Sequence, residues 1–418
     1  MRIRYLALLL VAVLTGCSDE GSNSNGVDAA PPDAAEAPHV PDVTPDANVP
    51  MFDKTRKTQE LSTGITVSYV EAGNTDGEVV IMLHGWTDTS RSFYPLIETL
   101  VADNTQFHIY ALDQRGHGAA SMPRAGDCAA TPEDCFEMTD FRDDVLAFMD
   151  ARDIETAHLV GHSLGTLVGQ ELALSDPDRV GSLVLIGTTV SGADNAVLLF
   201  LRNEVIEGQD ASKGHWRGLL EDATPGFRWP EDAYELTPAD ADPHVRDFME
   251  NVWVTELTAD PAFLGEIVPE TMDIRIGTWV GALRRLIAFS SQDRLRQLTV
   301  PTLVIWATQD VLFINEPDQV GVLAELDAAI AGCNLPYCFY KTYGKEPLPA
   351  DESQTDLGHN THWGAYEVIA ADVTAWITGD APTKELTYAN PGTAGSVLTE
   401  TGGALIIEKH QADPCTPP

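Results

Sequence analysis

Short apolar runs rich in β-branched residues alternate along this chain with longer segments in which apolar residues recur every three or four positions. The short runs are typical of buried strands, and the longer segments are typical of amphipathic helices. The predicted core strands lie at residues 79–83, 107–112, 157–160, 182–186 and 300–308. A leading hairpin is predicted over 57–70, and helices are predicted at 139–150, 164–174 and 365–377. This alternation predicts an α/β fold with a mostly parallel, doubly wound sheet.

The alternation is interrupted between residues 191 and 297, where the sequence is helix-like. Aromatic residues are spread through this segment: Trp216, Phe227, Trp229, Phe248, Trp253, Phe263 and Trp279. Because the segment lies between two predicted core strands, we predict a helical cap at the sheet edge where ligands bind. Residues 51–190 and 298–379 then form the core. Residues 380–418 are rich in Thr, Gly and Pro, are strand-like only at 404–408, and are predicted to form a tail.

The sequence Gly161-His162-Ser163-Leu164-Gly165 lies where a predicted strand meets a predicted helix. A serine on such a sharp turn adopts strained dihedral angles, and its hydroxyl is presented above the sheet. Gly161 and Gly165 allow the strand and the helix to pass closely. Ser163 is therefore the candidate nucleophile.

Two residues further along the chain could activate this serine. Asp310 follows the strand predicted at 300–308, and His359 precedes the last predicted helix. A serine hydroxyl is a weak nucleophile until a neutral imidazole removes its proton, and a buried carboxylate holds that imidazole in the correct tautomer. We therefore predict a catalytic triad of Ser163, His359 and Asp310.

A third predicted strand, at 79–83, ends in His84-Gly85-Trp86. The backbone N–H groups of Trp86 and Leu164 are predicted to form the oxyanion hole, which stabilises the negative charge of a tetrahedral intermediate.

Together these segments resemble the α/β-hydrolase superfamily, in its capped esterase, haloperoxidase-like and aminopeptidase-like branch. The matching segments are His84-Gly85-Trp86, Asp113-Gln114-Arg115-Gly116-His117-Gly118, Gly161 to Gly165, Asp310 and Gly358-His359, and they span residues 57 to 378. The resemblance implies the chain order Ser163, Asp310, His359 for the triad, and a loop-ordering role for Asp113. The chain departs from the family pattern at Ala120, at Gly364 and Tyr366, and in the loop that carries Cys128 and Cys135.

The function predicted from these residues is a serine hydrolase that cleaves an ester or lactone of a small to medium acyl substrate through an acyl-enzyme. A perhydrolase or haloperoxidase-like activity, an aminopeptidase and a C–C hydrolase of the same fold remain alternatives, as does a non-catalytic binding lipoprotein. No cofactor is expected. No metal is expected either, because His362, three residues after His359, has no evident third ligand.

The charge balance narrows the classes of partner that we expect. The chain has 64 acidic and 25 basic residues, a formal net charge of -39. Such a surface repels nucleic acid and anionic lipid and favours solubility, so the expected partner is a small-molecule substrate.

The N-terminus suggests export. Arg2 and Arg4 precede an apolar run at 5–14, which ends in Leu14-Thr15-Gly16-Cys17. This resembles a bacterial lipoprotein signal over 1–16, with Cys17 as the lipidated first residue; an ordinary secretory signal is the alternative. By the same resemblance, Ser18 favours the outer membrane. Residues 17–50 are rich in Ala, Pro and Asp and are predicted to form a disordered tether.

Five further cysteines fit an oxidising compartment. The close spacings predict the disulfides Cys128–Cys135 and Cys333–Cys338, with Cys415 unpaired.

Overall fold

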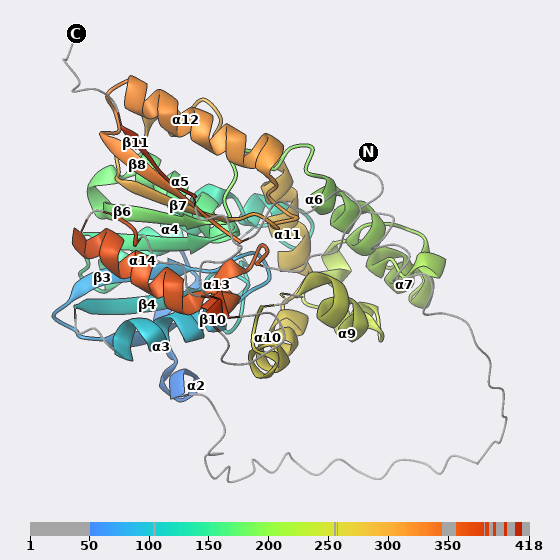
Figure 1. Ribbon diagram of the computed structural model, residues 1–418. Helices are drawn as coiled ribbons and strands as arrows, with labels where there is room; N and C mark the ends of the chain where they lie inside the picture. The colour runs from blue at the N-terminus through green and yellow to red at the C-terminus, as the bar shows by residue number, and fades with distance from the viewer. Residues whose placement is uncertain are drawn as a thin grey trace.

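A nine-stranded sheet forms the centre of the computed structural model (Figure 1). The structure describes residues 51–102, 106–124, 126–254, 256, 258–344, 357–379, 381–383, 388–389, 397–398 and 406–411. The predicted signal peptide, Cys17, the tether and Cys415 lie outside these residues. No helix in the described ranges combines the length and apolar character that a bilayer crossing needs.

The strand order is β1-β2-β4-β3-β5-β6-β7-β8-β11. The strands are β1 (Lys57–Glu60), β2 (Thr66–Gly73), β3 (Glu78–Leu83), β4 (Phe107–Asp113), β5 (Ala157–His162), β6 (Val180–Ile186), β7 (Thr302–Ala307), β8 (Tyr337–Tyr343) and β11 (Ile406–Gln411). The six strands from β4 to β8 in this order run parallel, whereas β1, β2 and β11 pair antiparallel at the two edges. The predicted α/β fold with a mostly parallel sheet is confirmed.

Strand β11 lies within the segment 380–418, for which the sequence predicted a tail. It pairs with β8, with Ile406 opposite Thr342 and Gln411 opposite Tyr337. This last of the described strands therefore extends the sheet at its edge. Two short strands, β9 (Tyr388–Ala389) and β10 (Val397–Leu398), pair separately.

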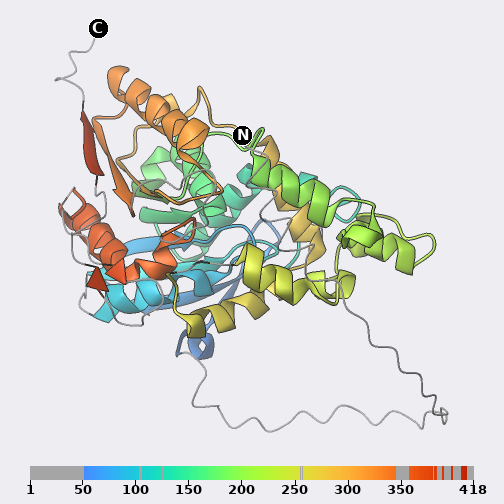
Figure 2. The same cartoon turned by 45° about the vertical axis from the view of Figure 1, so that its right-hand side comes forward.

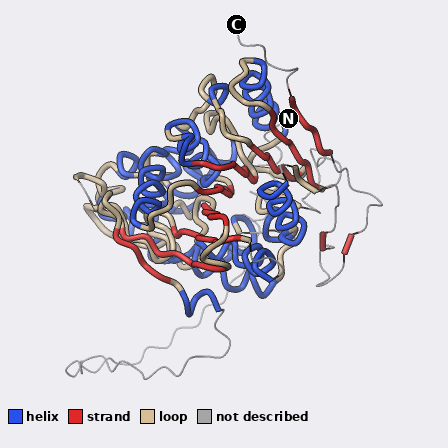
Figure 3. Tube along the Cα trace, turned by 90° about the vertical axis from the view of Figure 1, so that its left-hand side faces the viewer, coloured by secondary structure: helices blue, strands red, loops and turns tan. Residues whose placement is uncertain are grey.

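Helices cover both faces of the sheet (Figure 3). Strand β3 shows why, because successive side chains point to opposite faces. Val80 and Met82 belong to one apolar cluster with α3 (Tyr94–Ala102) and α14 (Tyr366–Gly379). Ile81 and Leu83 belong to the other, with α4 (Met138–Ala151), α5 (Leu164–Ser175) and α12 (Val320–Ala331). All four β3 side chains are fully buried.

Residues 191–297, here called the helical insert, connect β6 to β7. The insert contains α6 (Ala196–Phe200), α7 (Trp216–Ala223), α8 (Pro238–Ala241), α9 (Val245–Phe248), α10 (Pro261–Asp273) and α11 (Ile276–Ala288). These helices gather on one side of the sheet (Figure 2). Ser191 and Ser290 form an isolated antiparallel bridge, so the insert leaves and rejoins the core at one place.

The cysteine pattern is partly as predicted. The Cys128–Cys135 disulfide is confirmed, with 5.7 Å between the two Cα atoms. The predicted Cys333–Cys338 pair is wrong, because Cys333 is disulfide-bonded whereas Cys338 has a free thiol. The physical reason is location: Cys333 is exposed just after α12, and the fully buried Cys338 belongs to the apolar core around β8.

Candidate active site

Ser163 occupies the turn between β5 and α5. Its dihedral angles are φ 49° and ψ -116°, so the predicted backbone strain is confirmed. Gly165 passes so close to β3 that a Cβ on it would clash with the Leu83 carbonyl, and a Cβ on Gly161 would lie 2.5 Å from the Gly165 oxygen. The two glycines therefore allow the close approach that the turn requires. The Ser163 N–H donates to Ile186 O at 3.0 Å, which ties the turn to β6.

Asp310 and His359 meet at the carboxyl end of the sheet. The distance between His359 Nδ1 and Asp310 Oδ2 is 2.9 Å. The other carboxylate oxygen of Asp310 accepts from the backbone N–H groups of Leu312 at 2.8 Å and Phe313 at 2.9 Å. Because both oxygens are engaged and the side chain is only 1% exposed, the carboxylate has a fixed orientation toward the imidazole.

The environment of His359 affects its charge in two opposing ways. Burial disfavours the imidazolium, but the negative charge of Asp310 and its hydrogen bond outweigh burial and raise the pKa of His359 above 6.5. The second ring nitrogen, Nε2, is buried and makes no hydrogen bond within the described part of the chain. That nitrogen is therefore available to accept a proton.

Two contacts relate His359 to Ser163. Gly187, which follows the Ile186 carbonyl that holds the Ser163 N–H, lies against the imidazole, and a Cβ on Gly187 would be 3.3 Å from its Cε1. His162, which precedes Ser163 in the chain, has its ring centroid 5.0 Å from that of His359. These two residues, which contact the His359 ring, are therefore close to Ser163: His162 in the chain, and Gly187 through Ile186, to which the Ser163 N–H donates.

The loop after β3 lies directly beside Ser163. A Cβ on Gly85 would lie 3.1 Å from Ser163 Cβ, which leaves no room for a side chain there. Trp86 is the next residue of this loop, and Leu164 is the first residue of α5. Trp86 and Leu164 are therefore each one residue from this contact, Trp86 after Gly85 and Leu164 after Ser163.

His162 contacts both the segment that carries His359 and Asp88 in the loop after β3. Its Nε2 lies 3.1 Å from the His359 carbonyl oxygen, and its Nδ1 lies 3.5 Å from Asp88 Oδ2. With a proton on Nε2, the ring donates to the segment that carries His359. Burial lowers the pKa of His162, so the neutral ring is favoured. The motif Gly161 to Gly165 placed this residue beside Ser163, but the contact with residue 359 is not visible in the sequence.

His362 is fully buried and packs against other buried side chains. Its Nε2 lies 2.9 Å from Ser92 Oγ, which also accepts from the indole N–H of Trp363 at 2.9 Å. Burial, followed by the nearby His162 and His359, lowers the pKa of His362 well below 6.5.

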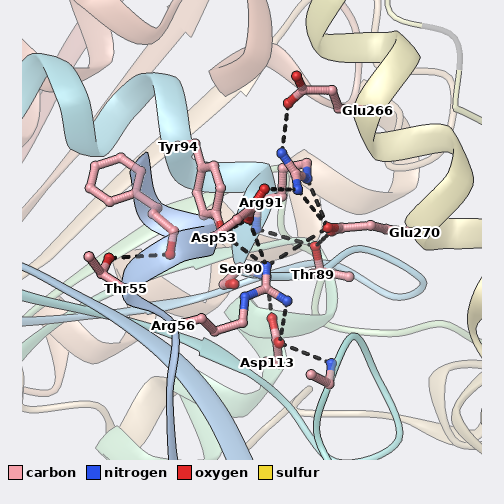
Figure 4. Close-up of polar contacts among 12 residues, drawn as sticks. Asp53, Thr55, Arg56, Thr89, Ser90, Arg91, Tyr94, Asp113, Glu266 and Glu270 are labelled. Atoms are coloured by element: carbon pink, nitrogen blue, oxygen red, sulfur yellow. Dashed lines mark hydrogen bonds and ion pairs between the residues drawn. The ribbon is translucent and has the colours of Figure 1, made fainter. Parts of the chain in front are cut away.

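Asp113 orders the adjacent loops, as the family resemblance implies. Its carboxylate accepts from the backbone N–H groups of Ser90 at 2.7 Å and Ala119 at 3.1 Å, and it pairs with Arg56 at 3.2 Å. Arg56 connects Asp113 to a larger cluster, here called the Arg91 network (Figure 4). The network comprises Asp53, Arg56, Thr89, Ser90, Arg91, Tyr94, Asp113, Glu266 and Glu270.

The helical insert contributes aromatic and acidic side chains next to this loop. The Trp86 ring packs edge-on against Trp253 and Trp279, with centroid distances of 5.2 and 5.1 Å. Glu256, which is 1% exposed, accepts from the backbone N–H of Gly358 at 3.3 Å. The aromatic composition of residues 191–297 indicated a packed segment, whereas no sequence signal distinguished Glu256 from other acidic residues.

Comparison with known proteins agrees with this architecture. The sequence profile of the alpha/beta hydrolase fold family matches residues 78–326. RutD of Variovorax paradoxus, a protein named for carbamate hydrolysis, is 31% identical over 245 residues, which cover 58% of this chain and 78% of the relative. The (E)-2-((N-methylformamido)methylene)succinate hydrolase of Acinetobacter baylyi is 28% identical over 173 residues, which cover 41% of this chain and 57% of the relative.

Solved structures show the same fold. The enol-lactonase from Burkholderia xenovorans aligns with a TM-score of 0.51 at 18% identity, covering 77% of this chain and 100% of that structure. The profile match over more than half of the chain, together with the named hydrolase relatives, establishes the assignment. The chain belongs to the α/β-hydrolase family and is a hydrolase.

Proposed function

We propose that this hydrolase cleaves esters or lactones of small to medium acyl substrates through a triad of Ser163, His359 and Asp310. The observation that carries the proposal is the hydrogen bond of 2.9 Å between His359 Nδ1 and Asp310, in combination with a buried His359 Nε2 that has no hydrogen bond among the described residues. The strained turn at Ser163 supports the same role.

In the proposed reaction, His359 Nε2 removes the hydroxyl proton of Ser163 while Oγ attacks the carbonyl carbon of the substrate. The tetrahedral intermediate expels the alcohol, which takes the proton back from His359, and an acyl-enzyme remains. A water molecule, deprotonated by His359, then attacks the acyl carbon and releases the acid and Ser163. Asp310 stabilises the imidazolium in both steps.

The oxyanion of each intermediate is proposed to accept from the backbone N–H groups of Trp86 and Leu164. Loss of one such donor typically lowers the rate about 10²–10³-fold. The contact between Gly85 and Ser163, which brings the loop with Trp86 close to the start of α5, supports this role.

The helical insert is proposed to act as a cap that shapes the acyl site. Its aromatic side chains Trp253 and Trp279 pack on Trp86, and such packing excludes water from a site where charge develops. Replacement of a pocket-facing tryptophan by alanine should therefore change chain-length preference.

A second candidate is hydrolysis of an acyl C–N bond, as in a carbamate or an amide. It is supported by the two relatives named above, one for carbamate hydrolysis and one for a formamido-succinate derivative. The triad chemistry would be the same, but the leaving nitrogen must be protonated by His359.

The proposal is tested by assaying the purified soluble domain on p-nitrophenyl esters of increasing chain length, on lactones, and on matched carbamates. Ser163→Ala, Asp310→Asn and His359→Ala should each reduce turnover by orders of magnitude, and the losses should not add. His362→Ala serves as the neighbouring control. The assignment of the base is wrong if His362→Ala abolishes activity while His359→Ala does not.

We also propose that the protein is exported and anchored to a bacterial membrane, with the outer membrane favoured, through lipid on Cys17. The Cys128–Cys135 disulfide supports an oxidising compartment. Cys17→Ser should release the protein from the membrane fraction or block its processing. Wild-type protein that is freely soluble and unlipidated after export would contradict this localisation.

A further inference from the structure

Thr87, the residue after the proposed oxyanion donor Trp86, has an unusual backbone conformation. Its φ is +69°, a left-handed value that is a genuine outlier for a β-branched residue. The Asp88 N–H donates to Gly85 O at 3.1 Å, so Gly85 to Asp88 form a turn in which Thr87 occupies the third position. With a left-handed third residue, such a turn normally has glycine there.

This turn sets the direction of the Trp86 N–H. The Gly85 carbonyl and the Trp86 N–H belong to one peptide plane, and a peptide plane is rigid. The Gly85 carbonyl oxygen accepts from Asp88 N–H and lies 2.8 Å from His84 Nδ1. The plane is thus fixed only while the turn keeps its shape, which requires Thr87 to remain left-handed.

Two side chains of the helical insert hold Thr87. The indole Nε1 of Trp253 donates to Thr87 Oγ1 at 2.6 Å, and Thr271 Oγ1 donates to the Thr87 carbonyl at 3.1 Å. Thr87 and Thr271 are each 1% exposed. The two bonds engage the side chain and the backbone of the same residue, so together they restrict its rotation.

The Arg91 network attaches α10 to the same loop. Arg91 pairs with Glu266 at 2.7 Å and with Glu270 at 2.9 Å, and the Thr89 hydroxyl donates to Glu270 (Figure 4). Thr271 directly follows Glu270 on this helix. The position of Thr271 against Thr87 is therefore supported by the contacts of the adjacent Glu270 with Thr89 and Arg91, which lie two and four residues after Thr87.

We propose that Trp253 and Thr271 are positioning residues for the oxyanion hole: they keep the strained Thr87 turn in the conformation that points the Trp86 N–H at the reacting carbonyl oxygen. The insert then contributes to stabilisation of the transition state as well as to covering the site. This inference rests on the proposed function, because it assumes that Ser163 forms an oxyanion intermediate.

A matched pair of substitutions tests it. Thr271→Val removes the hydroxyl that binds Thr87 O. Thr278→Val removes a hydroxyl of α11 whose hydrogen bonds go to Gly116 O at 3.0 Å and Met122 Sδ at 3.2 Å, and not to Thr87. Both are buried threonines of the insert that donate to a backbone carbonyl of the core. Trp253→Phe removes the second donor and retains an aromatic ring.

Two readouts separate positioning from stability. The first is kcat/KM on the best ester of the panel; the second is the inhibition constant of a trifluoromethyl ketone with the same acyl group, which forms a hemiketal oxyanion on the nucleophile. Thr271→Val and Trp253→Phe should each lower kcat/KM and raise the inhibition constant by about tenfold, with KM nearly constant. Thr278→Val should lower Tm comparably and leave both constants within about twofold.

A rescue experiment strengthens the test. Thr87→Gly makes the left-handed turn unstrained, so in this background Thr271→Val should change the inhibition constant by less than about twofold. The inference is overturned if Thr271→Val and Trp253→Phe leave both constants unchanged, or if Thr278→Val lowers kcat/KM and raises the inhibition constant as much as they do. If Ser163→Ala retains ester hydrolysis, the proposed function itself is refuted, and this inference with it.

Discussion

The rings of His162 and His362 lie 4.2 Å apart, centroid to centroid, and His162 also packs against His359. Burial lowers the pKa values of His162 and His362, whereas Asp310 raises that of His359 above 6.5 in spite of burial. Of these three imidazoles, only His359 therefore titrates above its usual range.

This difference predicts the pH dependence of the reaction. The proposed base works only as neutral imidazole, so kcat/KM should rise with pH through a single ionisation whose pKa is above 6.5. Asp310→Asn removes the charge that raises this pKa, so the residual activity should titrate at lower pH. Rate measurements from acid through neutral to mildly alkaline pH test this; an unchanged midpoint in Asp310→Asn, or a two-proton slope, would count against the assignment.

The Arg91 network should increase the free energy of unfolding of the protein. Arg91 is only 8% exposed at its side chain and pairs with three carboxylates, so Arg91→Met should lower the free energy of unfolding by about 2 kcal/mol. Glu266, which is 45% exposed, contributes little of this because water screens it. Arg228→Met, at an exposed arginine that also pairs with two carboxylates, is the control and should have no measurable effect in urea unfolding. Equal losses in both variants would contradict this view.

Lys341 and Asp372 form a fully buried ion pair, with 2.6 Å between Lys341 Nζ and Asp372 Oδ1. Removing one partner leaves an uncompensated charge, so Asp372→Ala should destabilise the protein by about 3–5 kcal/mol. The double substitution Lys341→Met with Asp372→Leu should recover most of that loss. Urea unfolding of the single and double variants checks this, and a double variant no more stable than Asp372→Ala would contradict it.

Cys338 should be chemically inert in the native protein. It is fully buried, and burial raises the pKa of its thiol to about 12, so almost no reactive thiolate is present. Iodoacetamide should modify Cys338 only after unfolding, as peptide mapping can show. Rapid labelling of the native protein, or recovery of Cys338 in a disulfide, would restore the pairing predicted from spacing.

Local patterns in the sequence predict most of the core. The strands before Trp86 and Asp310 contain continuous apolar runs because parallel strands are buried on both faces, and the one before Ser163 is interrupted by His158. Strand β8 has only the short run Tyr337-Cys338-Phe339-Tyr340 before the buried Lys341, whose partner Asp372 lies 31 residues away. Its apolar and polar residues therefore do not indicate a core strand.

The candidate site is predicted only as far as its motifs extend. The motif around Ser163 and the positions of Asp310 and His359 follow from strand ends and chain order. The bonds of Trp253 and Thr271 to Thr87 join residues 166 and 184 positions apart, and no local pattern relates such residues. The same limit applies to Cys338, whose spacing from Cys333 suggests a bond, although Cys338 is a free buried thiol in β8.

Covalent labelling tests the central claim most directly. Diethyl p-nitrophenyl phosphate reacts with an activated serine, transfers a phosphoryl group and releases p-nitrophenol. We predict that the label will be found on the peptide that contains Ser163, that its amount will follow the loss of esterase activity, and that Ser163→Ala will be neither labelled nor active. Complete inactivation without label on that peptide, or full esterase activity in Ser163→Ala, would contradict the account.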